Sequence, residues 1–280
     1  MLDHFPETAG GPGELNFRIR LWYNATSKFI YKANIMKKLA LIALVASVVC
    51  GCAKDDSDTL KMITEATFPP YEFMREQEIV GIDVEICRAV ARKLDRKFQC
   101  ETVNFDSVIP AVISGKADVA AAGITVTEDR RKNVDFSDPY VKTGIVVIFK
   151  KADPYTGPDC LKGRRIGVQG GTTSEAYVLE ELKQEPERST SPAESVAGLK
   201  SGRCDFVIAD VDPARNCVKG ENDLAISDFI TSEEYAIAIR KGRPDLLKAI
   251  NDTIAECKAD GRLQKWIEQY TAEADSQKDK

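Results

Sequence analysis

The chain has 280 residues, of which 43% are hydrophobic and 30% are charged, and this composition is typical of a soluble globular protein. Its formal net charge of −5 argues against a nucleic-acid partner, because nucleic acids bind basic surfaces. The one histidine, His4, lies near the N-terminus. Catalytic triads that need histidine, and histidine metal ligands, are therefore excluded for the rest of the chain.

The N-terminal region contains a segment typical of a secretory signal. Residues 36–52 read MKKLALIALVASVVCGC, in which two lysines precede an apolar stretch too short to span a bilayer comfortably. The run Val49-Cys50-Gly51-Cys52 resembles the lipobox of bacterial lipoproteins, which implies cleavage after Gly51 and acylation of Cys52. Secretion without a lipid, or retention of the segment as an anchor helix, are the alternatives.

The segments on either side of this signal differ from it in composition. Residues 1–35 precede a complete signal and show no hydrophobic period, so we interpret them as an upstream extension from a start codon assigned too early. Residues 53–58 are polar, and we expect them to form a short tether between the lipid and the folded domain.

The chain has eight cysteines, of which Cys50 and Cys52 belong to the signal. None of the other six has the CxxC spacing of a metal site, so zinc is not expected and no cofactor is predicted. They could form disulfides, whose pairing the sequence does not define, or remain buried thiols. These six are Cys87, Cys100, Cys160, Cys204, Cys217 and Cys257.

Short β-like runs alternate with helical patterns from residue 60 onward. We predict strands at 60–66, 98–103 and 118–123, with helices at about 82–94 and 106–114 between them. This alternation indicates an α/β fold with parallel strands.

Two parts of the chain repeat the same local pattern. In each, a helical run ends in Ser-Gly, at Gly115 and at Gly202, and an Asp then precedes an apolar strand. We expect both glycines to end their helices in the left-handed conformation. The repeat predicts two similar α/β lobes, and a ligand would bind in the cleft where the strand ends converge.

Several motifs in one order resemble the family of ABC-type solute-binding proteins for polar amino acids. The resemblance covers about residues 60–270 and implies a type II periplasmic-binding-protein fold, with two α/β lobes joined by a two-strand hinge. The motifs are ITEATFPPYEF (63–73), VGIDVEI (80–86), NFDSVIPAV (104–112), GITVTEDRRKNVDFSDPY (123–140), GVQGGTT (167–173) and CDFVIAD (204–210).

The same resemblance sets the expected boundaries of the domains. Lobe 1 is expected at 59–143 and 234–271, lobe 2 at 144–233, and a polar tail at 272–280. The two hinge strands are predicted at 143–150 and 235–241.

A buried α-amino acid needs a cation for its carboxylate and an anion for its ammonium. Thr127 can cap a helix that starts at Glu128, which places Arg130 in the first turn. The resemblance implies that the Arg130 guanidinium binds the ligand carboxylate in bidentate fashion. The alternative is an ordinary surface arginine.

The resemblance assigns the ligand ammonium to Asp210, which ends the apolar run at 206–209. Asp212 is the rival, although it could instead cap a helix that continues with Pro213. The Gly123 carbonyl and the Thr125 hydroxyl are expected to complete the contacts to the head group.

A glycine-rich turn at 170–173 leads from a strand into a helix, where exposed backbone N–H groups suit a carboxylate. By resemblance, Thr173 donates to the ligand carboxylate from lobe 2. The turn could also be an ordinary strand-to-helix loop.

The resemblance also gives residues for the ligand side chain. Phe68 and Phe105 could sandwich an aliphatic stem or a cationic head, although both could belong to the core. Glu65 and Gln169 match positions that line the pocket in relatives, and Glu65 favours a basic or amide side chain. Its alternative is an ion pair with a basic neighbour. Tyr71 is expected to pack.

The sequence therefore predicts a lipid-anchored extracytoplasmic binding subunit of an ABC importer. Its expected partners are a polar amino acid, the permease transmembrane subunits and a bacterial membrane reached through the lipid anchor only, and it is expected to be a monomer without enzymatic activity. The alternatives are a periplasmic cyclohexadienyl or arogenate dehydratase on the same fold and a module of a larger machine, such as a ligand-sensing receptor domain or the binding half of a membrane-bound lytic transglycosylase.

Overall fold

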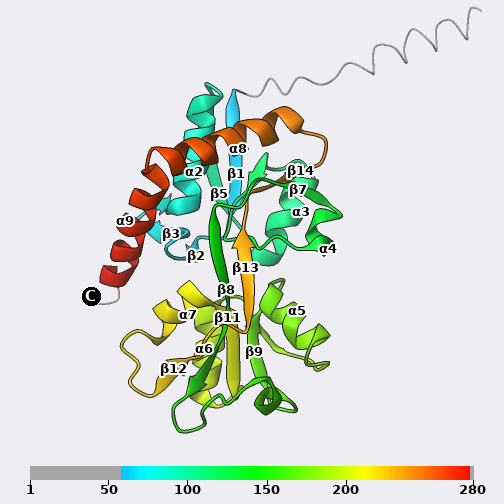
Figure 1. The fold of residues 1–280 in the computed structure, drawn as a ribbon, viewed down its shortest axis with the longest axis vertical. Helices are drawn as coiled ribbons and strands as arrows, with labels where there is room; N and C mark the ends of the chain where they lie inside the picture. The colour runs from blue at the N-terminus through cyan, green and yellow to red at the C-terminus, as the bar shows by residue number, and fades with distance from the viewer. Residues whose placement is uncertain (1–57, 278–280) are drawn as a thin grey trace, which may run out of the picture. The chain divides into compact units, whose positions relative to one another are not determined.

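The computed structural model describes residues 58–277, which form two α/β lobes (Figure 1). The predicted signal, the Cys52 anchor and residues 1–57 lie outside the described residues. Among the residues that are described, no helix is long and apolar enough to cross a membrane.

Lobe 1 is built on a five-stranded sheet with the strand order β5-β1-β6-β14-β7. A second, three-stranded antiparallel sheet has the order β2-β3-β4. The strands are β1 (Thr59–Thr64), β2 (Thr67–Phe68), β3 (Glu72–Arg75), β4 (Glu78–Val80), β5 (Lys97–Thr102), β6 (Val119–Ala120), β7 (Val134–Phe136) and β14 (Ala238–Arg240). The helices are α2 (Ile82–Lys93), α3 (Val108–Ile113), α4 (Glu128–Arg131), α8 (Pro244–Ala259) and α9 (Arg262–Gln277), with a 3-10 turn at Phe105–Ser107.

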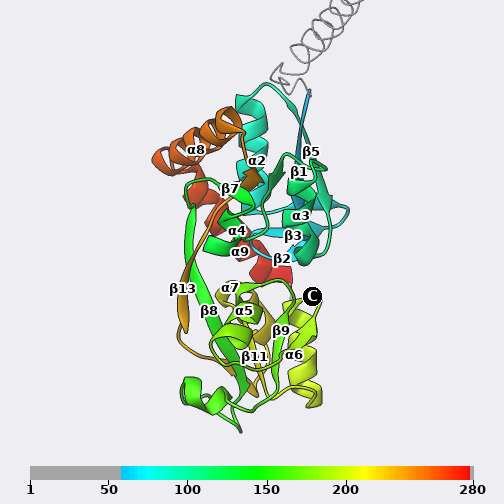
Figure 2. The same ribbon diagram turned by 90° about the vertical axis from the view of Figure 1, so that its right-hand side faces the viewer.

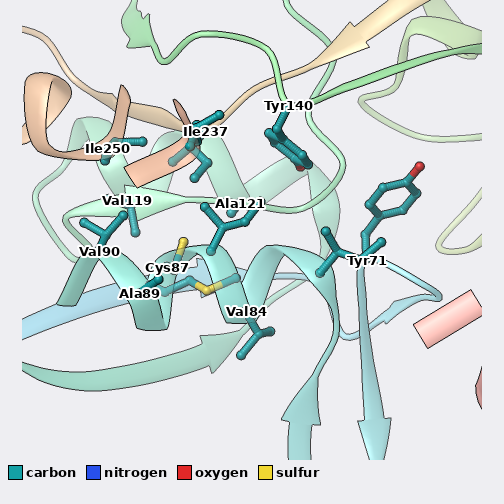
Figure 3. Packing of buried hydrophobic residues seen from close by; sticks show 14 of the residues in the cluster. Tyr71, Val84, Cys87, Ala89, Val90, Val119, Ala121, Tyr140, Ile237 and Ile250 are labelled. Atoms are coloured by element: carbon teal, nitrogen blue, oxygen red, sulfur yellow. The ribbon is translucent and has the colours of Figure 1, made fainter. Parts of the chain in front are cut away.

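Helices cover both faces of the lobe 1 sheet. Alternate residues of β1 point to opposite sides of this sheet, so the two faces of the strand pack against different helices. Leu60 and Met62 face the cluster formed with α2, α8 and α9, whereas Ile63 faces α3. Figure 3 shows the first of these clusters around α2, with Val84 and Val90 among its labelled side chains.

Lobe 2 is built on a six-stranded sheet with the order β10-β9-β11-β8-β12, and β13 also pairs with β8. Residues of β8 alternate in the same way: Val146 and Ile148 face α6 and α7, while Ile145 and Val147 face the α5 side. The strands are β8 (Val141–Lys150), β9 (Ile166–Gln169), β10 (Glu187–Ser189), β11 (Phe206–Asp210), β12 (Leu224–Ile226) and β13 (Thr231–Tyr235). The helices are α5 (Thr173–Glu180), α6 (Pro192–Ser201) and α7 (Val211–Val218), with a 3-10 turn at Pro158–Leu161.

Two antiparallel strands, β8 and β13, run between the lobes and form the hinge (Figures 1 and 2). Their register pairs Val141 with Tyr235 and Ile145 with Thr231. The prediction of a hinge strand at 235–241 is therefore wrong, because β14 in this segment pairs with β6 and β7 inside the lobe 1 sheet. The strand that crosses between the lobes is the preceding one, β13.

Two predicted elements are shorter in the structure. The helix predicted at 106–114 begins with a 3-10 turn and becomes α-helical only at Val108. Pro110 explains this start, since its ring would clash with the carbonyl of residue 106 in a longer α-helix. The strand predicted at 118–123 pairs over Val119–Ala120 only.

The repeated Ser-Gly pattern behaves as predicted in both lobes. Gly115 has φ 78° and Gly202 has φ 81°, so each follows its helix in the left-handed conformation. Within residues 58–277 no disulfide joins any two of the six cysteines, and no group of metal-binding side chains is found.

Candidate functional site

The candidate site lies in the cleft between the lobes and is lined by residues from both. Their side chains leave a cavity of only ≈ 10 Å³, which is about the lower limit for one water molecule. The lining residues are Phe68, Phe105, Gly123, Thr125, Arg130, Gln169, Thr172, Thr173 and Asp210. Eight of them are residues that the sequence analysis selected, and the ninth predicted residue, Glu65, contacts Gln169 of this set.

Arg130 is positioned by the cap of helix α4. The Thr127 hydroxyl accepts a hydrogen bond from the Arg130 backbone N–H at 3.2 Å, which confirms the predicted cap. The guanidinium donates to the Thr125 carbonyl at 2.8 Å and, across the cleft, to the Gly171 carbonyl at 3.0 Å. It also lies over the Phe105 ring, 5.5 Å from its centre. Arg130 therefore links both lobes with polar contacts.

Asp210 ends strand β11 and lies buried opposite the arginine. Its carboxylate accepts a hydrogen bond from the Tyr235 hydroxyl at 2.5 Å. Burial, and secondarily the nearby Glu233 carboxylate, raise the pKa of Asp210 to about 7, while Tyr235 and Arg130 oppose this shift. A cation that approaches Asp210 would favour the ionised form of its carboxyl group, so Asp210 can accept hydrogen bonds from such a cation.

Asp212 does not have the capping role that was considered for it. Asp210 occupies the N-cap position of α7 without a side-chain cap bond, and Asp212 lies inside the first turn. The Asp212 carboxylate instead accepts from the Tyr71 hydroxyl at 2.8 Å and from Arg215. Tyr71 is buried, as its predicted packing role requires, but its hydroxyl also joins the two lobes.

Gly123 forms the lobe 1 wall and is held from two sides. Its φ of 53° is in the left-handed region, and an added Cβ would lie 2.6 Å from the Phe68 ring, so only glycine fits. Its backbone N–H donates to the buried Asp83 carboxylate at 3.0 Å. The neighbouring Thr125 hydroxyl donates to Glu233 at 2.6 Å.

The glycine-rich turn brings lobe 2 against lobe 1. Gly171 has φ 79°, and an added Cβ would lie 3.2 Å from the Asp106 Cα of lobe 1. Its N–H donates to Glu175, and the Thr172 hydroxyl accepts from the Glu175 N–H as the cap of α5. Thr173 is the first helical residue of α5 and lines the cavity. The helix N-terminus therefore faces the cleft, although Glu175 occupies one of its N–H groups.

Glu65 and Gln169 meet at the far end of the site. The Gln169 side-chain amide donates to both Glu65 carboxylate oxygens, at 3.0 and 2.8 Å, and to the Thr190 carbonyl at 3.1 Å. Burial raises the pKa of Glu65, whereas the Gln169 amide counteracts this shift. In the described region no lysine or arginine forms an ion pair with Glu65, so the predicted alternative of a basic neighbour is not found.

Aromatic side chains close the lobe 1 side. The Phe68 ring contacts the Tyr71 ring at 5.8 Å and the Tyr235 ring at 6.3 Å, measured between ring centres. Phe68 therefore belongs to a buried aromatic cluster and also reaches the cavity, which combines both roles considered for it.

Two polar residues of the site were not found from the sequence. Tyr235 and Glu233 belong to the hinge strand β13 and reach Asp210 and Thr125, respectively. The sequence pattern at 231–235 has two adjacent glutamates between polar residues and gives no signal for a crossing strand. Only the β8–β13 pairing brings these side chains to the cleft.

The fold and the cleft define the class of a two-lobed periplasmic binding protein, whose lobes meet over a polar ligand site. A model of the bacterial extracellular solute-binding proteins, family 3, matches residues 60–273, and the chain belongs to this family. The fold prediction is thereby confirmed.

Individual relatives agree with this assignment. The chain is 34% identical over 246 residues to ABC transporter arginine-binding protein 1 of Escherichia coli (strain K12), covering 84% of this chain and 99% of that protein. It is 33% identical over 218 residues to the L-cystine-binding protein TcyJ of the same organism, covering 76% of this chain and 82% of that protein. A crystal structure of a mutant of ArgBP from T. maritima superposes with a TM-score of 0.72 at 36% identity, covering 77% of this chain and 96% of that one. These relatives are binding proteins rather than enzymes, as was predicted for this chain.

Proposed function

We propose that the chain is the substrate-binding subunit of an ABC importer and that it binds a basic amino acid, with L-arginine as the first candidate. The observation that carries this proposal is the placement of Arg130 and the buried Asp210 on one small cavity, where each influences the pKa of the other. A cation and an anion that line the same cavity suit the two charges of an α-amino acid head group.

The head group would be held from both lobes. Arg130 would exchange its bond to the Gly171 carbonyl for a bidentate pair with the ligand carboxylate. Thr173 would donate a further hydrogen bond to that carboxylate, and Thr125 would do so in exchange for its bond to Glu233. Asp210 and the Gly123 carbonyl would accept from the ligand ammonium.

The ligand side chain would extend toward Glu65 and Gln169. A second carboxylate, Asp106, acts on Glu65 and raises its pKa, so this end of the site is anionic and favours a cationic group. The Phe105 ring offers a face for the aliphatic stem of the ligand. The relative named above as arginine-binding agrees with this choice, as does ArgBP of T. maritima, which has been solved in an arginine-bound form, whereas the cystine-binding relative makes cystine the second candidate.

Binding would also require the lobes to move. A cavity of ≈ 10 Å³ does not hold an amino acid, so the ligand would enter only after the contacts across the cleft separate. The β8–β13 pair is the element about which the lobes would open. The hydrogen bonds that would be exchanged or re-formed are Gln169–Glu65, Arg130–Gly171, Asn216–Pro69 and Tyr71–Asp212.

The cellular setting follows from the N-terminal sequence. Cleavage after Gly51 and acylation of Cys52 would tether a monomeric domain to the outer side of a bacterial membrane. There it would deliver its amino acid to the transmembrane subunits of the permease.

A thermal-shift panel tests the proposal. At about 100 times its dissociation constant, a ligand stabilises the folded state by roughly 2.7 kcal/mol, which the melting temperature reports. We expect L-arginine to give the largest shift, with lysine and glutamine smaller and glutamate and aspartate near zero. A largest shift with L-cystine would support the second candidate, and no shift with any amino acid would contradict the proposed function.

A further inference from the structure

Two carboxyl groups are buried directly behind the candidate site. Glu72 of β3 and Asp83 of α2 both have 0% of their surface exposed. Both Glu72 oxygens and one Asp83 oxygen have no hydrogen-bond donor in the structure. A buried acceptor without a donor costs free energy, and a buried charge without a partner costs more, so this arrangement needs a physical account.

A single shared proton accounts for two of these three oxygens and leaves the other Glu72 oxygen as the carbonyl of a neutral acid. If Glu72 is protonated, its hydroxyl can donate to Asp83. The Asp83 backbone N–H donates to the carbonyl of Tyr71, the residue before Glu72, at 3.0 Å, so the two residues lie close together, and each carboxyl group acts on the pKa of the other by hydrogen bonding. The shared proton also leaves only one negative charge in the buried space. That charge would reside on Asp83, which lies in the first turn of α2 and accepts from the Gly123 N–H at 3.0 Å.

The surroundings of the pair favour a protonated Glu72 and an ionised Asp83. Burial raises the pKa of Glu72 well above its ordinary 4.5, and the nearby Asp83 carboxylate adds to the shift. Burial raises the pKa of Asp83 to about 6, but its Tyr140, Gly123 and Glu72 contacts lower it. The groups that act on the pair from the surrounding elements are Glu65, Tyr71, Cys87, Cys100 and Tyr140.

The pair bears on the candidate site through one glycine. Gly123 is fixed in a left-handed conformation, with the Phe68 ring on one side and the Asp83 carboxylate on its N–H. Phe68 is itself the cross-strand neighbour of Glu72. The backbone conformation of Gly123, which lines the cavity, therefore depends in part on Asp83, which does not line it.

We infer that Glu72 and Asp83 form a proton-sharing carboxyl pair, and that the pair positions Gly123 as an acceptor for the ligand ammonium. The second part rests on the proposed function, and the first part does not. Glu72 and Asp83 are positioning residues, because they act on the ligand only through Gly123.

The first part makes a prediction for stability in the absence of ligand. A carboxyl group whose pKa is raised on folding contributes stability that is present below its unfolded value of 4.5 and is lost as the pH rises through its folded pKa. Glu72→Gln keeps the donor to Asp83 but does not titrate. Its melting temperature relative to the wild type should therefore rise steadily from pH 5 to pH 8. Glu76→Gln, an exposed position between β3 and β4, is the control and should show no such trend.

Infrared spectroscopy of the unliganded protein tests the proton directly. At pH 7 the carbonyl band of protonated carboxylic acids should be stronger in the wild type than in Glu72→Gln, because the contribution of Asp210, whose pKa is about 7, is the same in both proteins. An unchanged spectrum, or a difference in melting temperature that is independent of pH, would overturn the inference.

The second part is tested at Gly123. In nuclear magnetic resonance spectra, the Gly123 amide should move strongly in Asp83→Asn and little in Glu72→Gln. Affinity for L-arginine should fall at least about 10-fold in Asp83→Asn and stay within about threefold in Glu72→Gln, since only the first loses a charge-assisted bond to Gly123. If Asp83→Asn folds and binds L-arginine as tightly as the wild type, the positioning role is refuted. If the wild type does not bind L-arginine, the amide shift still decides the structural link, and the proposed ligand alone fails.

Discussion

Gln169 of lobe 2 donates its side-chain amide to both carboxylate oxygens of Glu65 of lobe 1, at 3.0 and 2.8 Å. The two residues belong to different lobes, so this contact exists only when the cleft is closed. Because Gln169 is uncharged, it does not neutralise the negative charge that Glu65 carries when it is ionised.

Glu65→Gln should therefore weaken a cationic ligand selectively. We expect L-arginine to lose about 10-fold or more in affinity and a small neutral amino acid to change by less than about threefold, because only the first loses a charge-assisted contact. Competition calorimetry with the two ligands measures this difference. Tightest binding of glutamate or aspartate by the wild type would contradict this assignment, while the head-group contacts would stand.

Arginine affinity should also depend on the protonation of Glu65. Its pKa is raised by burial, so lowering the pH through that value converts it to the neutral acid and removes the attraction for the guanidinium. Wild-type affinity for L-arginine should fall as the pH drops. This loss should be smaller in Glu65→Gln, which gives the two proteins different pH profiles.

Removal of either head-group partner should nearly abolish binding. Arg130→Ala and Asp210→Ala each leave the other charge buried and unpaired, at a cost of about 3–5 kcal/mol, or two to three decades or more in affinity. Arg131→Ala is the matched control, because its side chain is 48% exposed on the same helix. Calorimetric losses below threefold at Arg130 or Asp210 would show that other residues bind the head group.

Tyr235→Phe should shift the pH dependence of binding rather than abolish it. The Tyr235 hydroxyl lowers the pKa of Asp210 from an otherwise higher value, and the wild-type pKa is about 7. Without this hydrogen bond the acid becomes neutral at a higher pH, so it accepts the ligand ammonium less well near pH 7. The affinity loss should be larger at pH 7 than at pH 9. A loss of equal size at both would indicate a packing effect only.

Gly171→Ala should impair closure of the lobes. Gly171 and Gly202 have nearly the same φ, 79° and 81°, so alanine at either position costs roughly 1–2 kcal/mol in backbone strain. Only at Gly171 would the new Cβ meet the opposite lobe, 3.2 Å from the Asp106 Cα, whereas nothing lies within 4 Å at Gly202. We expect similar losses of thermal stability in both variants, but weaker ligand binding in Gly171→Ala alone. If Gly171→Ala and Gly202→Ala bind the ligand equally well, the close approach of Gly171 to Asp106 is not required for binding.

The lipid anchor can be tested independently of the cleft. Expressed from Met36 in a bacterium, the protein should incorporate radioactive palmitate, and Cys52→Ala should lose the label. Persistent labelling of the variant would point to Cys50 or refute the lipobox.

Local sequence signals predicted the parts of the site that depend on local structure. The Thr127 cap of α4 follows from a threonine three residues before Arg130, and its bond to the Arg130 N–H is present. The left-handed Gly115 and Gly202 likewise follow from a pattern of adjacent residues. Recognition of several motifs in one order added the residues whose placement is not local, such as Asp210.

Contacts between distant segments could not be predicted in the same way. The bond from Tyr235 to Asp210 depends on a strand crossing whose sequence at 231–235 is polar and lacks an apolar period. The segment 235–241 was predicted instead, because its continuous apolar run at 235–239 is what the interior of the lobe 1 sheet also requires. The Glu72–Asp83 pair was also missed, because its role depends on the burial of both carboxyl groups, which the spacing of the two residues in the sequence does not reveal.

The antiparallel pairing of β8 with β13 also determines how this molecule could be taken apart. Because Val141 lies opposite Tyr235, both ends of the segment that forms lobe 2 leave lobe 1 at neighbouring points. Lobe 2 is therefore a single continuous insertion with adjacent ends, and it could be exchanged as a cassette for the same lobe of a relative. Such a chimera would keep Arg130 and Glu65 while importing new partners at Gln169, Thr173 and Asp210, so that the contribution of each lobe to ligand choice could be measured separately.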